Sequence, residues 1–133
     1  MSVQGSCLCG GISYSYSGEK KEIAMCHCQQ CRKAQGSAFG ANMVIDKAYF
    51  LLIDDNMLLK EFESSADKIR SFCSHCGSPL YSYRKSIPGK LRLRIGTLDT
   101  KITQAVNYHA FYDAKAEWYE ANDTLEKFPN AKP

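Results

Sequence analysis

The sequence has no apolar run long enough to cross a membrane. Its longest apolar-leaning stretch, residues 48–59, is broken by Asp54, Asp55 and Asn56, whereas a spanning helix needs about 20 consecutive apolar residues. Residues 1–6 are polar and carry neither a basic start nor an apolar stretch. We therefore expect a protein without a secretory signal, located in the cytoplasm and without a membrane partner.

The sequence also lacks repeats of fixed period, low-complexity tracts and a large charge of one sign. Its 133 residues, 44% of them hydrophobic, suffice for one domain over 1–133 and are too few for two. The net charge is a mild +3, and the basic stretch at 84–94 is typical of a solvated hairpin face. Without interleaved surface aromatics, that stretch argues against nucleic-acid binding.

Period-two alternation predicts a mostly β fold. Residues 12–16 alternate apolar or aromatic side chains with serine, and residues 90–95 alternate leucine and isoleucine with basic side chains. Runs rich in aromatic and branched residues predict further strands at 39–45, 49–53, 58–62, 79–83 and 105–112. We expect few and short helices, one at 29–35 closed by Gly36 and a weaker one at 113–120.

Seven cysteines fall into three tight groups with the spacing of metal ligands. The groups are Cys7 and Cys9, then Cys26, Cys28 and Cys31, then Cys73 and Cys76. A reducing cytosol disfavours structural disulfides, and an odd number of cysteines cannot all pair within one chain. Keeping each group intact, only the first and last groups together give a closed tetrahedral zinc site. The middle group then remains for a second zinc.

The middle group predicts a zinc ion with an open position. Three thiolates within six residues can hold one ion unaided, so water or a substrate can be the fourth ligand, and a small thiol is the natural substrate. Alternatively, His27 or another side chain closes the shell, and the ion is a second structural staple. In an extended segment His27 points away from the ion, so we expect it beside the ligands or at the surface.

Four further polar residues are candidate substrate contacts. Arg32 and Lys33 directly follow the last ligand, where they could attract substrate carboxylates or form a solvated helix face. Ser37 or His109 could donate a hydrogen bond to a developing alkoxide. His109 could equally be a core histidine, and His75, inside the turn between Cys73 and Cys76, is expected to be exposed.

A set of motifs covers nearly the whole chain. They are residues 5–11 (GSCLCGG), 26–33 (CHCQQCRK), 36–37, 63–65, 72–80 (FCSHCGSPL), 96–99 (GTLD) and 109–128. Together they resemble the glutathione-dependent formaldehyde-activating enzyme family, also found as the CENP-V-type domain. The resemblance implies an Mss4-like fold of small β-sheets around two zinc ions. It assigns Cys7, Cys9, Cys73 and Cys76 to a structural ion and Cys26, Cys28 and Cys31 to a catalytic one.

The resemblance also implies an activity. The family's named reaction condenses formaldehyde with glutathione to S-hydroxymethylglutathione and is classed as a carbon–sulfur lyase for the reverse direction. The rival hypothesis is a non-catalytic, zinc-stabilised binding module of the Mss4-like type, which would bind a partner and no thiol. The oligomeric state stays open, a homodimer included.

Overall fold

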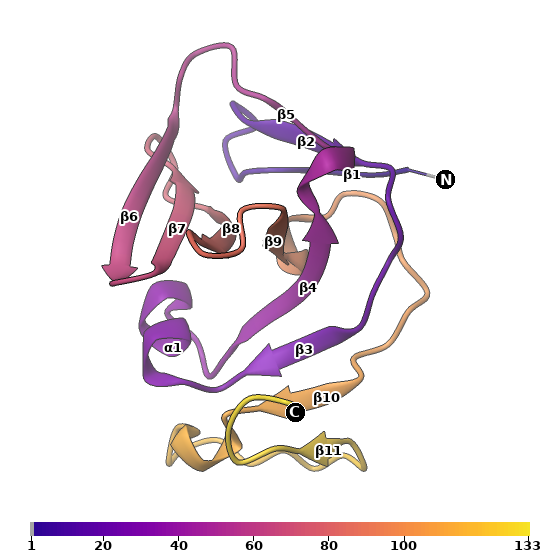
Figure 1. Cartoon of the computed structure of the whole chain (residues 1–133), viewed down its shortest axis with the longest axis vertical. Coiled ribbons are helices and arrows are strands. Elements are labelled where there is room, and N and C mark those ends of the chain that lie inside the picture. The colour runs from indigo at the N-terminus through magenta and orange to yellow at the C-terminus, as the bar shows by residue number, and fades with distance from the viewer. Residues whose placement is uncertain (1) are drawn as a thin grey trace. The chain divides into compact units, whose positions relative to one another are not determined.

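The computed structural model describes residues 2–133 and is mostly β, as predicted (Figure 1). Within this range the chain forms eleven strands, three short 3-10 helices and one α-helix. None of the helices has the length and apolar character needed to span a membrane. The backbone groups into two compact units, which are described separately below; the single domain over 1–133 stays a prediction.

The first unit comprises residues up to 21 and 43–103 and contains a small antiparallel sheet. Its strands, in spatial order, are β1 (Val3–Ser6), β2 (Ser13–Tyr16) and β5 (Phe50–Ile53). Tyr14 and Tyr16 are buried and alternate with less buried serines, which is the pattern of a half-buried strand. Gly5 lies opposite Tyr14, and a Cβ at Gly5 would come within 2.2 Å of the Tyr14 ring. Glycine is therefore required at this position.

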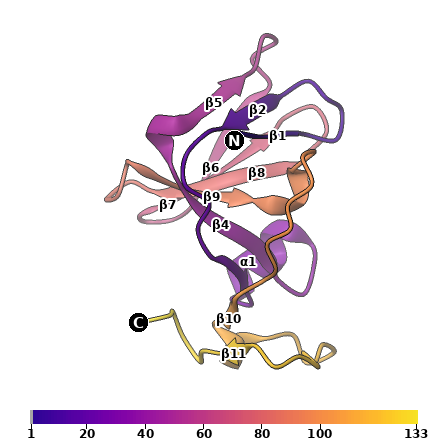
Figure 2. The same ribbon diagram turned by 90° about the vertical axis from the view of Figure 1, so that its right-hand side faces the viewer.

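An antiparallel meander forms the rest of the first unit (Figure 2). Its strands are β6 (Leu59–Ser65), β7 (Lys68–Cys73), β8 (Pro79–Arg84) and β9 (Lys90–Arg94). β4 (Gly40–Asp46), of which residues 43–46 belong to this unit, follows β9 in the strand order. η1 (Lys47–Tyr49) and η2 (Ile95–Thr97) are single 3-10 turns. Buried side chains alternate along β7, β8 and β9. Leu80, Leu91 and Leu93 thereby build the core of this unit.

The second unit comprises residues 22–42 and 104–133. β10 (Tyr108–Ala110) lies between β3 (Ile23–Cys26) and β11 (Glu126–Lys127) and runs parallel to both. The backbone N–H of His27 extends this pairing by donating to Ala110 O at 3.0 Å. α1 (Gln29–Gln35) follows and ends at Gly36, whose left-handed φ of 62° suits glycine. The middle cysteine group is thus anchored to the C-terminal segment of the chain.

Most predicted elements are confirmed, with small shifts at their ends. The helix at 29–35 and the strands around 12–16, 39–45, 49–53, 58–62, 79–83 and 90–95 are all present. The strand expected over 105–112 is limited to β10, and the helix expected at 113–120 is wrong. Phe111 is left-handed with φ 53°, η3 (Tyr112–Ala114) is a single turn, and Lys115 returns to an extended ψ of 155°, so no α-helical turn can propagate. Strands β1, β3, β7 and β11 have no counterpart in the prediction.

Candidate metal centres

Cys7 and Cys9 lie in a tight loop between β1 and β2. The loop closes through hydrogen bonds from Cys7 N–H to Ile12 O and from Gly10 N–H to Cys7 O, both 3.0 Å. Gly10 has φ 76°, which an L side chain would resist. Two further amides point at sulfur: Ile12 N lies 3.3 Å from Cys7 Sγ and Gly11 N lies 3.4 Å from Cys9 Sγ. The loop therefore presents both thiols with amides already arranged to stabilise thiolates.

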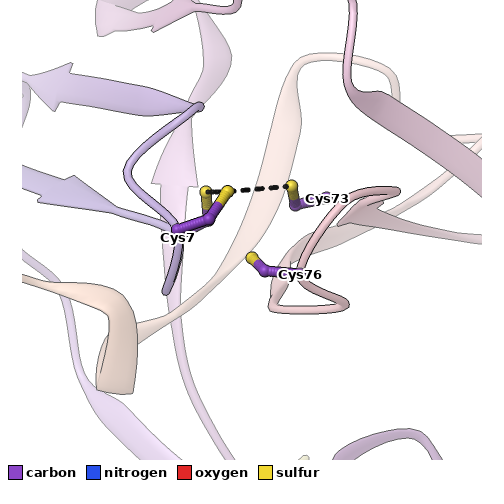
Figure 3. A group of neighbouring side chains, drawn as sticks. Cys7, Cys73 and Cys76 are labelled. Carbon is purple, nitrogen blue, oxygen red and sulfur yellow. Dashed lines mark hydrogen bonds between the residues drawn. The ribbon is translucent and has the colours of Figure 1, made fainter.

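Cys73 and Cys76 form the predicted turn at the end of β7. Gly77, with φ 80°, donates its N–H to Cys73 O at 2.8 Å, and Cys73 N–H donates to Ser78 O at 3.0 Å. The sulfur atoms of Cys7, Cys73 and Cys76 point toward one another from the two loops (Figure 3). His75 is exposed within this turn, as expected. Both turns therefore belong to one cluster in the first unit.

The four-cysteine cluster has the dimensions of a tetrahedral zinc site. All four sulfurs lie within 4.8 Å of one another; Cys7 Sγ and Cys9 Sγ are 3.5 Å apart, and Cys9 Sγ and Cys73 Sγ are 3.8 Å apart. Tetrahedral zinc with Zn–S bonds of about 2.3 Å requires sulfur separations of about 3.8 Å. The cluster could therefore hold zinc.

The proton affinities of these thiols are unequal without a cation. The Ser78 hydroxyl beside Cys76 lowers the pKa of that thiol to about 5. The Gly11 amide lowers the pKa of Cys9, but desolvation and the other three thiols outweigh it and raise the pKa to about 12. The environments of Cys76 and Cys9 thus shift their pKa values in opposite directions, and a bound divalent cation would stabilise all four cysteines as thiolates.

Cys26, Cys28 and Cys31 form a second cluster, in the second unit. Cys26 ends β3, Cys28 is the N-cap of α1, and Cys31 lies buried in the first helical turn. Cys28 Sγ accepts the Cys31 N–H at 3.3 Å, the usual geometry of an N-cap side chain and the amide three residues on. The three sulfurs lie within 4.8 Å of one another, because this cap places Cys28 and Cys31 on the same side of the turn.

This second cluster supplies three ligands and could also hold zinc. Among residues 2–133, no histidine, carboxylate or further cysteine joins the group. The thiols of Cys28 and Cys31, then burial, raise the pKa of Cys26 far above its ordinary value. Three thiolates in this space therefore also require a cation. Three sulfurs and no fourth protein ligand match the composition of a zinc site with one open position.

His27, between two of these cysteines, is fully buried. Its ring is surrounded by those of Phe39, His109, Tyr112 and Tyr119, with centroids 5.0–5.8 Å away. Burial, followed by the charges of His109, Lys115 and Arg32, lowers the pKa of His27 to about 4. The prediction that His27 could lie at the surface is therefore wrong. Its ring is enclosed by other rings and lies beside the cysteine ligands, which is the other position expected for it.

A hydrogen-bonded chain connects His27 to the C-terminal segment. His27 Nε2 lies 2.8 Å from His109 Nδ1, and His109 Nε2 lies 2.9 Å from Asp123 Oδ2. His109 is fully buried, and its hydrogen bond to Asp123, the largest effect, lowers the pKa of that carboxyl to about 2. Asp123 was not predicted, because a single acidic residue far from the cysteines in the chain has no distinguishing spacing.

The remaining predicted contacts differ in their surroundings. Arg32 is half-buried, with a buried Nε that has no hydrogen-bond partner in the described part of the chain, whereas Lys33 and Ser37 are exposed. Both ring nitrogens of His109 are occupied by hydrogen bonds, so a bond from His109 to a ligand would require one of them to break. Of these four residues, Arg32 is therefore the one with a buried polar atom, Nε, that lacks a hydrogen-bond partner among residues 2–133.

Comparison with known proteins gives a fold match. The crystal structure of a structural-genomics target from Rhodobacter sphaeroides is similar, with a TM-score of 0.62 and 17% sequence identity, over 75% of this chain and 91% of that chain. At this identity the likeness shows a shared fold alone. No curated protein matches the sequence.

A family model gives the stronger result. The model described as glutathione-dependent formaldehyde-activating enzyme matches residues 2–114. This range contains all seven cysteines and His109, while Asp123 lies beyond it. The mostly β architecture and the two cysteine clusters agree with the predicted Mss4-like fold. The chain belongs to the glutathione-dependent formaldehyde-activating enzyme family.

Proposed function

We propose that this chain is a zinc-dependent enzyme of the carbon–sulfur lyase type. Its reaction joins a small thiol, glutathione in the first instance, to formaldehyde and gives S-hydroxymethylglutathione. The observation that carries the proposal is the cluster of Cys26, Cys28 and Cys31, three converging sulfurs without a fourth protein ligand among residues 2–133. Family membership over residues 2–114 supports the same reaction class.

The reaction is an addition. The thiol S–H adds across the carbonyl: a sulfur–carbon bond forms, the carbon–oxygen π bond breaks, and the thiol proton ends on the oxygen. Zinc held by Cys26, Cys28 and Cys31 would supply an open ligand position where a thiol loses its proton near neutral pH. The remaining task of the chain is to bind the thiol compound and to stabilise the oxygen as negative charge develops.

Arg32 is the residue we assign to the substrate's carboxylates. It follows Cys31 on α1, and its buried Nε lacks a hydrogen-bond partner in the described residues. A guanidinium binds carboxylates through two parallel hydrogen bonds, and glutathione carries two carboxylates. Lys33, which is exposed, adds a more distant positive charge. Ser37, exposed just after the helix, is proposed to donate its hydroxyl to the developing alkoxide.

The cluster of Cys7, Cys9, Cys73 and Cys76 is proposed to hold a second, structural zinc ion. Its four sulfurs, all within 4.8 Å of one another, would complete a tetrahedral shell and leave no ligand position for a substrate. All seven cysteines are free thiols, which is compatible with the reducing cytoplasm as the protein's compartment. On this proposal the chain carries two zinc ions with different roles.

Formation of S-hydroxymethylglutathione from ¹³C-labelled formaldehyde, followed by NMR, tests the proposal. The zinc-loaded protein should accelerate the reaction above the spontaneous rate, and Cys28→Ser should abolish the acceleration because one of three ligands is lost. Cysteine and 2-mercaptoethanol, offered in place of glutathione, show whether the carboxylates matter. Absence of acceleration with every thiol, in a protein that carries both zinc ions, would favour the non-catalytic binding module instead.

A further inference from the structure

Asp123 is held in a fixed orientation at the edge of the second unit. Its Oδ1 accepts hydrogen bonds from Leu125 N–H and from Lys127 Nζ, both at 3.1 Å. Its Oδ2 is left for His109 Nε2, at 2.9 Å. The carboxylate is partly open to solvent, with 37% of its side chain exposed, while His109 is fully buried. A surface charge therefore has a defined contact with a buried imidazole.

The direction of the hydrogen bonds follows from the donors available. An ionised carboxylate only accepts, so the proton between Asp123 and His109 belongs to His109 Nε2. In the neutral ring, His109 Nδ1 then has a lone pair and accepts a hydrogen bond from His27 Nε2, 2.8 Å away. His27 is thereby protonated at Nε2 and unprotonated at Nδ1. That Nδ1 is buried and has no partner in the described residues, so it stays available as an acceptor.

The position of His27 in the chain gives this bond a consequence for the cysteines. Its backbone N–H is bonded to Ala110 O at 3.0 Å, and its ring is enclosed by Phe39, Tyr112 and Tyr119. With backbone and ring both fixed, the peptides leading to Cys26 and Cys28 have little freedom. A restrained backbone at His27 would limit the directions that these two thiols can take when a metal ion binds.

We propose that Asp123 is a positioning residue for the three-cysteine loop. Through His109 it holds His27 in the tautomer protonated at Nε2, and the fixed His27 ring keeps Cys26 and Cys28 directed toward Cys31. The inference rests on one part of the proposed function, the binding of zinc by Cys26, Cys28 and Cys31, and does not require the thiol reaction. Asp123 lies beyond residues 2–114, the range of the family match. The contact between Asp123 and His109 therefore involves a residue outside the matched range.

Histidine nitrogen NMR of the full-length, zinc-loaded protein tests the tautomers directly. Long-range ¹H–¹⁵N correlations should show protonated Nε2 and unprotonated Nδ1 for both His27 and His109. In Asp123→Asn the amide can donate to His109, so the two tautomers should invert, as they do when an amide replaces the carboxylate that orients a catalytic histidine. Asp113→Asn, an exposed acid in the same unit, is the matched control and should leave both spectra unchanged.

Zinc affinity gives the second readout. Chelator competition should show the more weakly held zinc ion bound about tenfold less tightly in Asp123→Asn, as expected when support around a metal site is removed; Asp113→Asn should match the wild type. A wild-type spectrum with His27 protonated at Nδ1 would overturn the inference, even if the variant did not fold. Lower zinc affinity with unchanged tautomers would also overturn it. If the tautomers are as stated and no thiol reaction occurs, the proposed function fails while this inference stands.

Discussion

The sulfur atoms of Cys9 and Cys73 lie 3.8 Å apart, although 64 residues separate them in the chain. The contact joins the loop after β1 to the end of β7. A hydrogen bond from Leu8 N–H to Ser78 Oγ, 2.8 Å long, links the same two loops. If zinc binds all four sulfurs, as proposed, the stability of the first unit should depend on the ion.

Loss of the four-cysteine site should be far more damaging than loss of the three-cysteine site. Cys73 is fully buried and belongs to a closed shell, and structural zinc contributes on the order of 10 kcal/mol in small zinc domains. Cys73→Ser, or exhaustive chelation, should abolish the cooperative thermal transition. Cys31→Ser is the matched variant and should stay folded but lose activity. Equal collapse of both variants would mean that both metal ions are architectural.

Gly5→Ala should destabilise the first unit by about 1–3 kcal/mol, the usual range for overpacking. The new Cβ would lie 2.2 Å from the Tyr14 ring and 2.6 Å from the Thr97 carbonyl oxygen, and a backbone oxygen cannot move aside easily. Gly96→Ala is the control, because nothing lies within 4 Å of its added Cβ. Urea unfolding of the two variants measures the difference, and equal stabilities would contradict the packing described for β1 and β2.

Tyr14 should make part of the stability pH-dependent in the alkaline range. Burial raises the pKa of Tyr14 to about 12, whereas a tyrosine in an unfolded chain ionises near 10. The unfolded state therefore releases a proton that the folded state retains, so this contribution is complete below about pH 10 and is lost as the pH rises toward 12. Tyr83, whose hydrogen bond to Glu61 also raises its pKa to about 12, adds to the same slope.

Urea unfolding between pH 8 and 12 isolates the contribution of Tyr14. Tyr14→Phe should be less stable than wild type at pH 8, because the hydroxyl's bond to Thr97 is lost, and the difference should shrink as the pH rises. Tyr49→Phe, at an exposed ring, is the control and should follow the wild-type curve. A constant gap between Tyr14→Phe and wild type across this range would show that Tyr14 does not titrate as described.

Arg32→Met should weaken glutathione binding more than Lys33→Met. Arg32 has a buried, unpartnered Nε, whereas Lys33 is exposed, and a charge-assisted hydrogen bond is worth about 1.5–3 kcal/mol. The expected result is a KM for glutathione raised by about tenfold or more in Arg32→Met and changed little in Lys33→Met. If 2-mercaptoethanol, which has no carboxylate, shows the same rise, then Arg32 acts on the loop and not on the substrate.

The sequence predicts the cysteine clusters well, because thiol spacing constrains metal geometry directly. The division into four and three cysteines agrees with the two groups of sulfurs in the structure. Helix α1 was also predictable, since Gly36 provides a strong end signal. The mostly β fold followed from period-two alternation in residues 12–16 and 90–95. The alternation of β7, with Ile69, Ser71 and Cys73 buried, was missed.

The environment of His27 could not be predicted from sequence. Its partner His109 is 82 residues away, and the parallel pairing of β3 with β10 that brings them together leaves no local pattern. β11, with two residues, is too short to give a periodic signal. The helix expected at 113–120 failed for a related reason: tertiary contacts hold Tyr112 and Tyr119 around His27, and these contacts override local helix preference.

Zinc content per chain, measured together with a glutathione titration in wild type and Cys28→Ser, decides whether the three-cysteine cluster binds a zinc ion that accepts a thiol. We expect two zinc ions and saturable glutathione binding in the wild type, and one zinc ion with no glutathione binding in Cys28→Ser. A glutathione titration that is unchanged in Cys28→Ser, or a wild type that carries a single zinc ion under metal-replete conditions, would show that the cluster has no such role.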